Sequence, residues 1–155
     1  MINEPNWIKV RQAHVGDICD ITRFNSEMAL ETEAISLDPT VLKAGVHKVI
    51  LEPSLGFYLI AEVGGTAIGQ LLITKEWSDW RNHVFWWIQS VFVAPAYRRM
   101  GVYTALYDKV LEMAGDETNI CGIRLYVDRN NLVAKQTYSN LGMSHSNYDM
   151  YEVSL

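Results

Sequence analysis

Apolar and polar residues alternate along the chain with two different periods. An alternation of period two is typical of a strand with one buried face, whereas apolar residues three and four positions apart are typical of an amphipathic helix. The strand-type pattern predicts strands over 7–12, 57–63, 66–74, 83–93 and 120–127, with one or two closing strands in 144–155. The helix-type pattern predicts helices over about 17–33, 39–50, 102–115 and 131–141.

Turn and cap residues indicate how these elements connect. Gly64 and Gly65 suit a tight hairpin, so the strands on either side should pair antiparallel. A full helix separates the strands 83–93 and 120–127, which should therefore run parallel through a right-handed crossover. We expect an α/β fold of the α+β kind. It would contain a mixed sheet of six to seven strands, with an antiparallel meander beside a parallel pair and four flanking helices.

The stretch from Val91 to Tyr103 joins a buried strand to a helix through a short basic turn. The first turn of a helix has unpaired N–H donors and partial positive charge, so it attracts anions. Gly101 lets an anion approach the backbone, and Arg98 and Arg99 add charge beside it. This pattern predicts a site for a pyrophosphate. The alternative is that the glycine and the two arginines only form a solvated loop. Neither the P-loop motif nor G-x-G-x-x-G occurs before a helix.

Composition narrows the class of protein. A chain of 155 residues that is 49% hydrophobic and 20% charged predicts one globular domain over 1–155. A net charge of −5 argues against a general nucleic-acid binder. Without a secretory signal or an apolar run long enough to span a bilayer, we expect a cytoplasmic protein with no membrane partner. The two cysteines and four histidines show no metal or disulfide spacing, so we expect no metal.

A second motif follows about thirty residues after Gly101. Asn131, Ala134, Tyr138 and Gly142 are three, four and four positions apart, which places them on one face of a helix. A small residue at Ala134 would let a ligand lie close to this face. The alternative is that Asn131 only caps the helix and Tyr138 is a half-buried core residue.

Together, V-x-V-x-P-x-Y-R-R-x-G-V and N-x-x-A-x-x-x-Y-x-x-x-G-M resemble the GCN5-related N-acetyltransferases, the GNAT family, over nearly the whole chain. The resemblance implies acetyl-CoA as co-substrate, with its pantetheine arm entering where the two parallel strands splay. Arg98 and Gly101 match the family's Q/R-x-x-G-x-G/A loop, but Tyr103 replaces the usual glycine or alanine. Either the helix start is displaced, or this tyrosine points away from the ligand.

The resemblance implies a role for each matched position. Val91 and Val93 would pair with pantetheine through the main chain, and Asn131 would contact it. The backbone from Arg99 to Tyr103 would hold the pyrophosphate. The expected cofactor-binding residues are Val91, Phe92, Val93, Arg98, Arg99, Met100, Gly101, Val102, Tyr103, Asn131, Ala134 and Tyr138.

Acetyl transfer to an amine also needs an acid and a base. Tyr138 matches the tyrosine that protonates the departing thiolate, and an N–H near Phe92 or Val93 would polarise the carbonyl. Many family members carry a carboxylate on the strand that precedes the loop, but Gln89 cannot accept a proton usefully. Glu31 and Glu33 are the remaining candidates for the base, unless they are a solvated helix end. A water chain or an already neutral amine would also suffice. No serine or cysteine has an activated context, which favours direct transfer.

Aromatic residues predict the character of the acceptor. Those at 77, 80, 85, 86 and 87 would form a pocket for a small cationic amine, unless Trp86 and Trp87 alternate across the sheet into the core and under a helix or a dimer partner. The leading prediction is an N-acetyltransferase for a small primary amine. The alternatives are an acetyltransferase for protein N-termini or lysines, and a non-catalytic acyl-CoA-binding regulatory module. A homodimer stays open.

Overall fold

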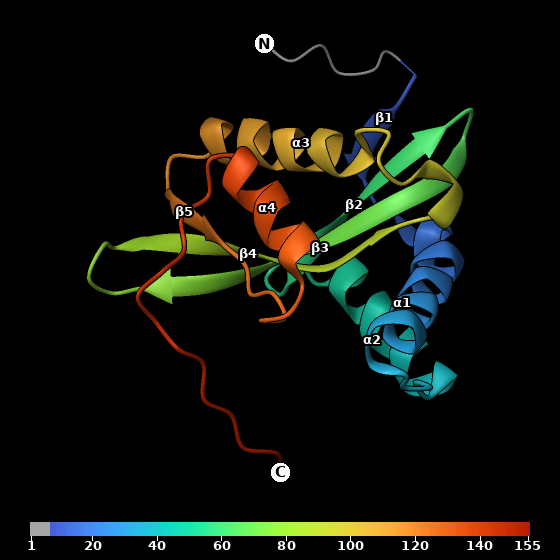
Figure 1. The fold of residues 1–155 in the computed structure, drawn as a ribbon, viewed down its shortest axis with the longest axis horizontal. Helices are drawn as coiled ribbons and strands as arrows, with labels where there is room; N and C mark the ends of the chain where they lie inside the picture. Colours follow the sequence, from blue (N-terminus) through green and yellow to red (C-terminus); the bar gives the residue numbers. More distant parts are fainter. Residues whose placement is uncertain (1–6) are drawn as a thin grey trace. The chain divides into compact units, whose positions relative to one another are not determined.

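The structure is a computed structural model that describes residues 7–155. Its described strands form one sheet in the order β1-β2-β3-β4-β5 (Figure 1). Neighbours from β1 to β4 are antiparallel, and β4 and β5 are parallel, as predicted. The strands are β1 (Lys9–Gln12), β2 (Gly56–Val63), β3 (Thr66–Ser78), β4 (His83–Val93) and β5 (Ile120–Arg124).

The four predicted helices are present, and local signals mark their ends. Asp38 caps α2, because its Oδ1 accepts hydrogen bonds from the amides of Thr40 at 2.8 Å and Val41 at 3.2 Å. Ala34 ends α1 in the left-handed conformation, with φ of 53°. None of the described helices is long and apolar enough to cross a bilayer. The helices are η1 (Val15–Asp17), α1 (Ile18–Glu33), α2 (Pro39–Leu51), η2 (Pro95–Tyr97), α3 (Val102–Asp116) and α4 (Leu132–Asn140).

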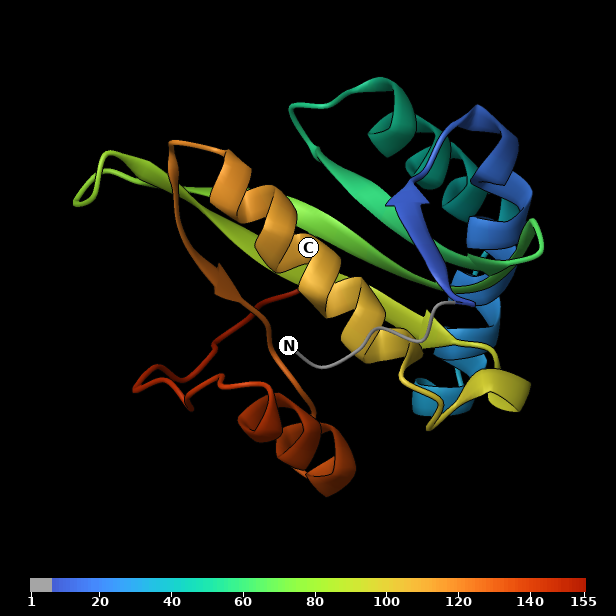
Figure 2. The same cartoon turned by 90° about the horizontal axis from the view of Figure 1, so that it is seen from above.

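The described chain divides into two compact units, one ending at Leu125 and the other running from Tyr126 to Leu155. The first unit contains the sheet and α1 to α3, and the second contains α4 and the tail. Within the first unit, α3 lies on one face of the sheet and α1 and α2 lie on the other (Figures 1 and 2).

Both faces of the sheet are packed. Tyr58, Ile60 and Leu72 on one face form a buried cluster with residues of α1 and α2, which are Ile18, Ile21 and Val46. On the other face, α3 lies so close to β3 that a Cβ at Gly69 would be 3.0 Å from Val102 Cγ1. A larger residue at position 69 would push α3 away from the sheet. This packing fixes where the first turn of α3 begins relative to β4.

The predicted sheet of six to seven strands is wrong, since the described sheet has five. The tail 144–155 forms no strand, and its apolar side chains, such as Tyr151 and Val153, are exposed. Alternation in the sequence does not supply the partner that a strand needs for its backbone hydrogen bonds. Conversely, residues 75–78, which lie beyond the predicted strand 66–74, extend β3 because they continue the ladder opposite 83–86. β5 ends at Arg124, where its pairing with β4 ends.

Candidate active site

The two parallel strands separate where the cofactor arm was predicted to enter. Their ladder runs from Val84 opposite Ile120 to Trp87 opposite Arg124, but β4 continues to Val93. Over residues 88–93, therefore, no described strand pairs with β4 on the side of β5. Main-chain donors and acceptors along this edge can bind an extended ligand as a further strand would.

A bulge interrupts β4 within the same stretch. Gln70 pairs with Phe92 and Leu72 pairs with Gln89, so two residues of β4 stand opposite Leu71 alone. Ser90, one of these two, has a φ of 50°, which a residue with a side chain adopts rarely. The sequence does not predict this bulge, because nothing marks a serine in an alternating strand as left-handed.

The basic turn after β4 leads into a helix at the position that the sequence predicts. Gly101 lies at φ of 83° as the N-cap of α3, and Arg99 also has a positive φ, of 63°. The N-caps of α2 and α4, Asp38 and Asn131, use their side chains to accept backbone N–H groups. Gly101 has no side chain to do so, and therefore the first amides of α3 remain open to an anionic ligand.

The two arginines of this turn differ in whether they form an ion pair. Arg98 donates through its two terminal nitrogens to the carboxylate of Glu31, at 2.5 and 2.7 Å, and through Nε to the carbonyl of Val93 at 2.9 Å. Arg99 forms no ion pair with any residue from 7 to 155. The cationic group available to a phosphate in this conformation is therefore Arg99 rather than both arginines.

The candidate bases lie at the end of α1, and Arg98 distinguishes them. Its hydrogen bonds hold the pKa of Glu31 below the usual value, against a smaller opposing effect of burial. A carboxylate stabilised in this way accepts a proton less readily. Glu33 is exposed and ends α1. Gln89 occupies the strand position discussed above and donates to Thr74 Oγ1 at 2.6 Å.

Tyr103 packs along α3. Because α3 begins at Val102, directly after Gly101, the helix start matches the loop pattern. The ring of Tyr103 stacks on Tyr107, one turn later, with ring centroids 6.2 Å apart. This packing favours the alternative in which the tyrosine leaves the anion site clear.

The second unit contains the three remaining predicted residues on α4 and at its N-cap. Asn131 Oδ1 accepts the amide of Ala134 at 3.0 Å, so the capping role considered as an alternative is present. The side-chain nitrogen of Asn131, Nδ2, remains a donor for a ligand. Burial raises the pKa of the Tyr138 hydroxyl, which therefore keeps its proton at neutral pH.

The aromatic residues predicted to line the acceptor pocket do not form one cluster. Trp86 is a core residue, 4% exposed, with its ring edge-on to Phe57 at 5.2 Å. Trp77 and Trp80 are 60% and 86% exposed. The guanidinium of Arg124 lies over the ring of Phe85, 3.6 Å from its centre. Its face is thus occupied by a cation of the protein itself.

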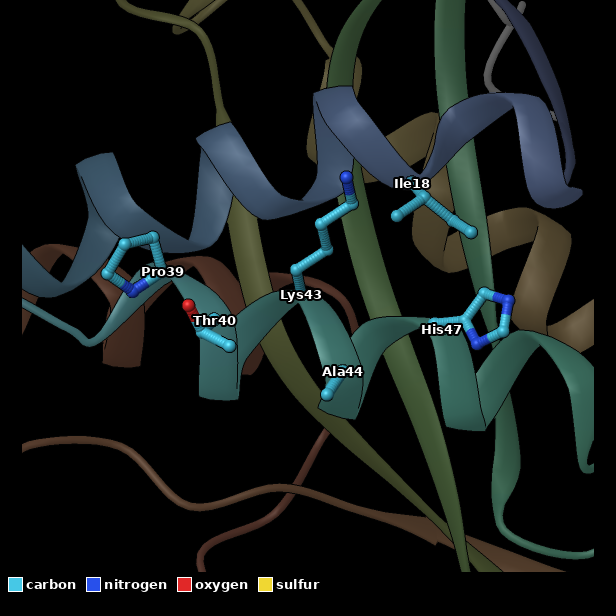
Figure 3. Close-up of a pocket in the computed structure, with 6 residues that line it drawn as sticks. All are labelled: Ile18, Pro39, Thr40, Lys43, Ala44 and His47. Carbon is cyan, nitrogen blue, oxygen red and sulfur yellow. The ribbon is translucent and has the colours of Figure 1, made fainter.

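A cavity of about 500 Å³ opens elsewhere in the first unit, along α1 and α2 (Figure 3). Figure 3 shows Lys43 reaching from α2 toward α1 across it. None of its lining residues belongs to the predicted site. They are Ile18, Pro39, Thr40, Lys43, Ala44 and His47.

Comparison with known proteins places this geometry in a family. The model of the acetyltransferase (GNAT) family matches residues 21–143. A possible acetyltransferase from Clostridium difficile 630 is 40% identical, with a TM-score of 0.90 over 97% of this chain and 99% of that one. No curated protein matches.

Two more distant structures share the fold. One is a predicted acetyltransferase from Clostridium acetobutylicum, solved with acetyl-CoA, at 18% identity and a TM-score of 0.76 over 95% of this chain and 96% of that one. The other is an aminoglycoside acetyltransferase from an uncultured soil metagenomic sample, at 17% identity and a TM-score of 0.74 over 96% of this chain and 98% of that one.

Proposed function

The chain belongs to the GNAT acetyltransferase family, which uses acetyl-CoA, and from that premise we propose that it acetylates the primary amine of a small molecule by direct transfer. The observation that carries the proposal is the uncapped start of α3, with Arg99 beside it, directly after the unpaired edge of β4. An anion-binding turn next to an edge that binds an extended chain suits a ligand with a pyrophosphate and a peptide-like arm.

The cofactor-binding residues follow from this arrangement. The amides of residues 99–103 and the side chain of Arg99 hold the pyrophosphate, while Val91 and the N–H of Val93 pair with the pantetheine arm. The carbonyl of Val93 already accepts Arg98 Nε, which leaves less of its capacity for the arm. The family resemblance assigns two residues of the second unit to the same arm, Asn131 as a donor and Ala134 as a small residue that allows close approach. Acetyl-CoA supplies the activated acetyl group.

Each catalytic residue moves one proton. The amine forms a bond to the acetyl carbon as the bond from carbon to sulfur breaks. Glu33 takes the amine proton, directly or through water, in preference to Glu31, whose pKa Arg98 lowers. Tyr138 donates its hydroxyl proton to the departing sulfur, and its raised pKa keeps that proton in place until transfer.

One comparison supports a small acceptor, because an acetyltransferase for aminoglycosides shares the fold. A non-catalytic acyl-CoA-binding module is the second candidate, because Gln89 stands where many relatives carry a carboxylate and Glu31 is engaged by Arg98.

The test combines binding with turnover. Calorimetry with acetyl-CoA and CoA measures cofactor affinity, and thiol release is followed over a panel of small amines and peptides. Turnover with a small amine is the expected result. Turnover with peptides alone would indicate a protein acetyltransferase, and binding without turnover would indicate the regulatory module. A protein that binds neither form of the coenzyme would overturn the proposal.

Two variants test the assigned roles. Tyr138→Phe should lower kcat about a hundredfold with little change in the affinity for acetyl-CoA, because only proton donation is lost. Tyr148→Phe, an exposed tyrosine of the tail, is the matched control and should leave kcat unchanged. Unchanged turnover in Tyr138→Phe would remove this residue from the mechanism.

A further inference from the structure

A buried glutamine lies beneath the bulge of β4. Gln70 on β3 is fully buried, and its Nε2 donates to the carbonyl oxygen of Ser90 at 3.2 Å and to Asn25 Oδ1 at 2.8 Å. Asn25 on α1 is 5% exposed and in turn donates to Tyr58 Oη at 3.4 Å. A line of buried side-chain amides therefore connects α1 and β2 to the residue at which β4 departs from regular pairing.

Burying the side-chain amide of Gln70 in the core costs free energy. A buried amide needs partners for its oxygen as well as its nitrogen, but Gln70 Oε1 accepts no hydrogen bond from the residues the structure describes. A leucine or methionine would fill the same space without that cost. What an apolar residue cannot do is donate to the Ser90 carbonyl, so the donor on Nε2 is the distinctive contribution of this side chain.

The Ser90 carbonyl matters because of the backbone that follows it. Ser90 is held at a positive φ, which side chains disfavour, and such a conformation persists only when its surroundings impose it. A bulge reorients the peptide groups of its strand. The peptide groups that follow Ser90 are those of Val91, Phe92 and Val93. The proposed function assigns Val91 and Val93 to the pantetheine arm, and an N–H near Phe92 or Val93 is expected from the sequence to polarise the acetyl carbonyl.

We propose that Gln70 is a positioning residue for acetyl transfer. By holding the Ser90 carbonyl, it maintains the bulge and so aims the amides of residues 91–93 at the thioester. The inference rests on the proposed function, since those amides need a ligand to act on. Gln70 itself touches neither substrate. It acts through the main chain of β4, with Asn25 fixing the orientation of its amide group.

The first experiment removes the donor. Gln70→Leu should lower kcat about tenfold or more, because misaligned donors stabilise developing charge poorly, while KM for acetyl-CoA changes less than about threefold. The matched control is Ile60→Val, which weakens the same buried core without touching Ser90. It should lower thermal stability and leave kcat unchanged. Equal effects on kcat in the two variants would show that Gln70 has only a structural role.

A second variant restores the donor by changing pH. Gln70→Glu keeps the shape of the side chain, but its ionised form cannot donate to Ser90, whereas its protonated form can. Burial raises the pKa of a carboxyl group in such a site. The ratio of its kcat to that of the wild type should therefore rise as pH falls. The proposal would be overturned if this ratio stayed constant with pH and Gln70→Leu kept the kcat of the wild type.

A spectroscopic readout separates this inference from the proposed function. In ¹H–¹⁵N spectra of the ligand-free protein, Gln70→Leu, which lacks the donor at every pH, should shift the amides of residues 90–93, and Ile60→Val should not. Unmoved amides would contradict the role of Gln70 even in an active enzyme. Shifted amides in a protein that binds no coenzyme would support the structural link and refute the proposed function instead.

Discussion

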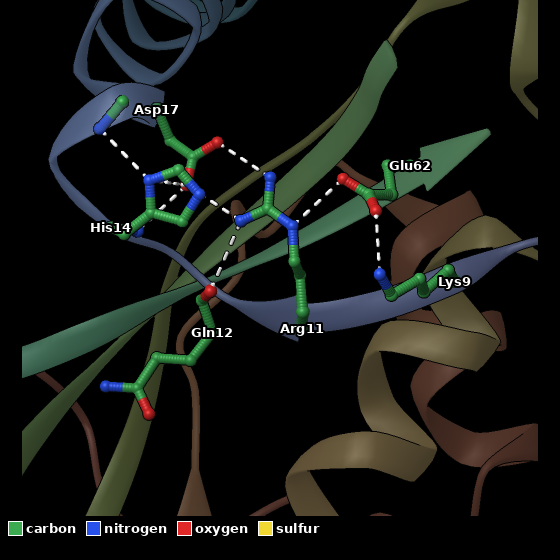
Figure 4. A network of polar contacts seen from close by, with 7 residues as sticks. Lys9, Arg11, Gln12, His14, Asp17 and Glu62 are labelled. Atoms are coloured by element: carbon green, nitrogen blue, oxygen red, sulfur yellow. Dashed lines mark hydrogen bonds and ion pairs between the residues drawn. The ribbon is translucent and has the colours of Figure 1, made fainter. Parts of the chain in front are cut away.

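Two arginine–carboxylate clusters of the first unit use the same forked contact in different surroundings. In the first, Arg11 on β1 donates to both oxygens of Asp17 at 2.8 Å and through Nε to Glu62 at 2.9 Å, while Lys9 adds a second cation to Glu62 (Figure 4). Asp17 also accepts the backbone amide of His14 at 2.8 Å. The carboxylates of Asp17 and Glu62 are only 7% and 11% exposed.

The second cluster is Arg98 with Glu31, whose side chains are 38% and 48% exposed. Water screens this pair, so it contributes little to stability, and its arginine can exchange one anionic partner for another at low cost. The buried cluster cannot do this, since removing one partner leaves an uncompensated charge in the protein. The comparison indicates that burial of the carboxylate partners, more than burial of the arginines, separates the structural cluster from the exposed pair beside the proposed cofactor site.

The largest expected effect comes from the buried cluster. Asp17→Ala should lower the free energy of unfolding by about 3 kcal/mol and Tm by about 9 °C, because Arg11 and the His14 amide lose a shared partner. Asp20→Ala, which removes an exposed partner of Arg23, should cost less than about 0.5 kcal/mol. Urea unfolding measures both. Similar losses in the two variants would contradict the distinction by burial.

The same cluster should respond to acid. Hydrogen bonds from Arg11 hold the pKa of Asp17 below its usual value of 3.8, so the unfolded chain takes up this proton before the folded protein does. The stabilisation is complete above the usual pKa and is lost as pH falls through the folded one. The difference in unfolding free energy between wild type and Asp17→Asn should thus be constant above about pH 5 and shrink below about pH 4. A difference that persists at lower pH would argue against the pairing.

At the exposed site, the effect should appear in binding instead. Arg99→Ala should weaken CoA binding about tenfold at low salt, and by less at high salt, because an exposed guanidinium contributes a screened charge to the pyrophosphate site. Arg23→Ala, on an exposed part of α1, is the control and should leave the dissociation constant unchanged. Calorimetry at two salt concentrations measures both. An affinity independent of Arg99 would place the phosphates elsewhere.

The smallest effect is expected for Glu31→Gln. Stability should change by less than about 1 kcal/mol, since the lost pair is exposed. The dissociation constant for CoA should fall about threefold, because a negative charge leaves the site and Arg98 is released. The kcat should be retained, whereas Glu33→Gln should lower it. A large loss of stability would show that the two clusters do not differ as proposed.

Local signals predicted the helices and the basic turn well. Asp38 and Pro39 mark the start of α2, and Gly101 marks the start of α3, because caps and positive φ depend on residues a few positions away. The strands were predicted less well at their ends. Residues 75–78 pair despite their polar composition, and the alternating tail from Ser144 forms no ladder. Pairing depends on a distant partner, which periodicity does not reveal.

In the candidate site, too, features that depend on nearby residues were predicted and features that depend on distant residues were not. The resemblance to the family located the turn and the strand edge, but Glu31, predicted as a base, is engaged by an arginine 67 positions away. Gln70 was not predicted at all, because a glutamine in a strand is ordinarily exposed. Its role depends on Ser90 and Asn25, 20 and 45 positions away.

The amino-acid pattern alone determines the helices, the antiparallel order of the central strands and the glycine at the mouth of α3, since each follows from neighbours along the chain. Tertiary packing decides which arginine is engaged, which carboxylate has a lowered pKa and where β4 bulges. Hydrogen bonds and ion pairs act over a few ångströms of space, and distance along a folded chain does not measure that separation.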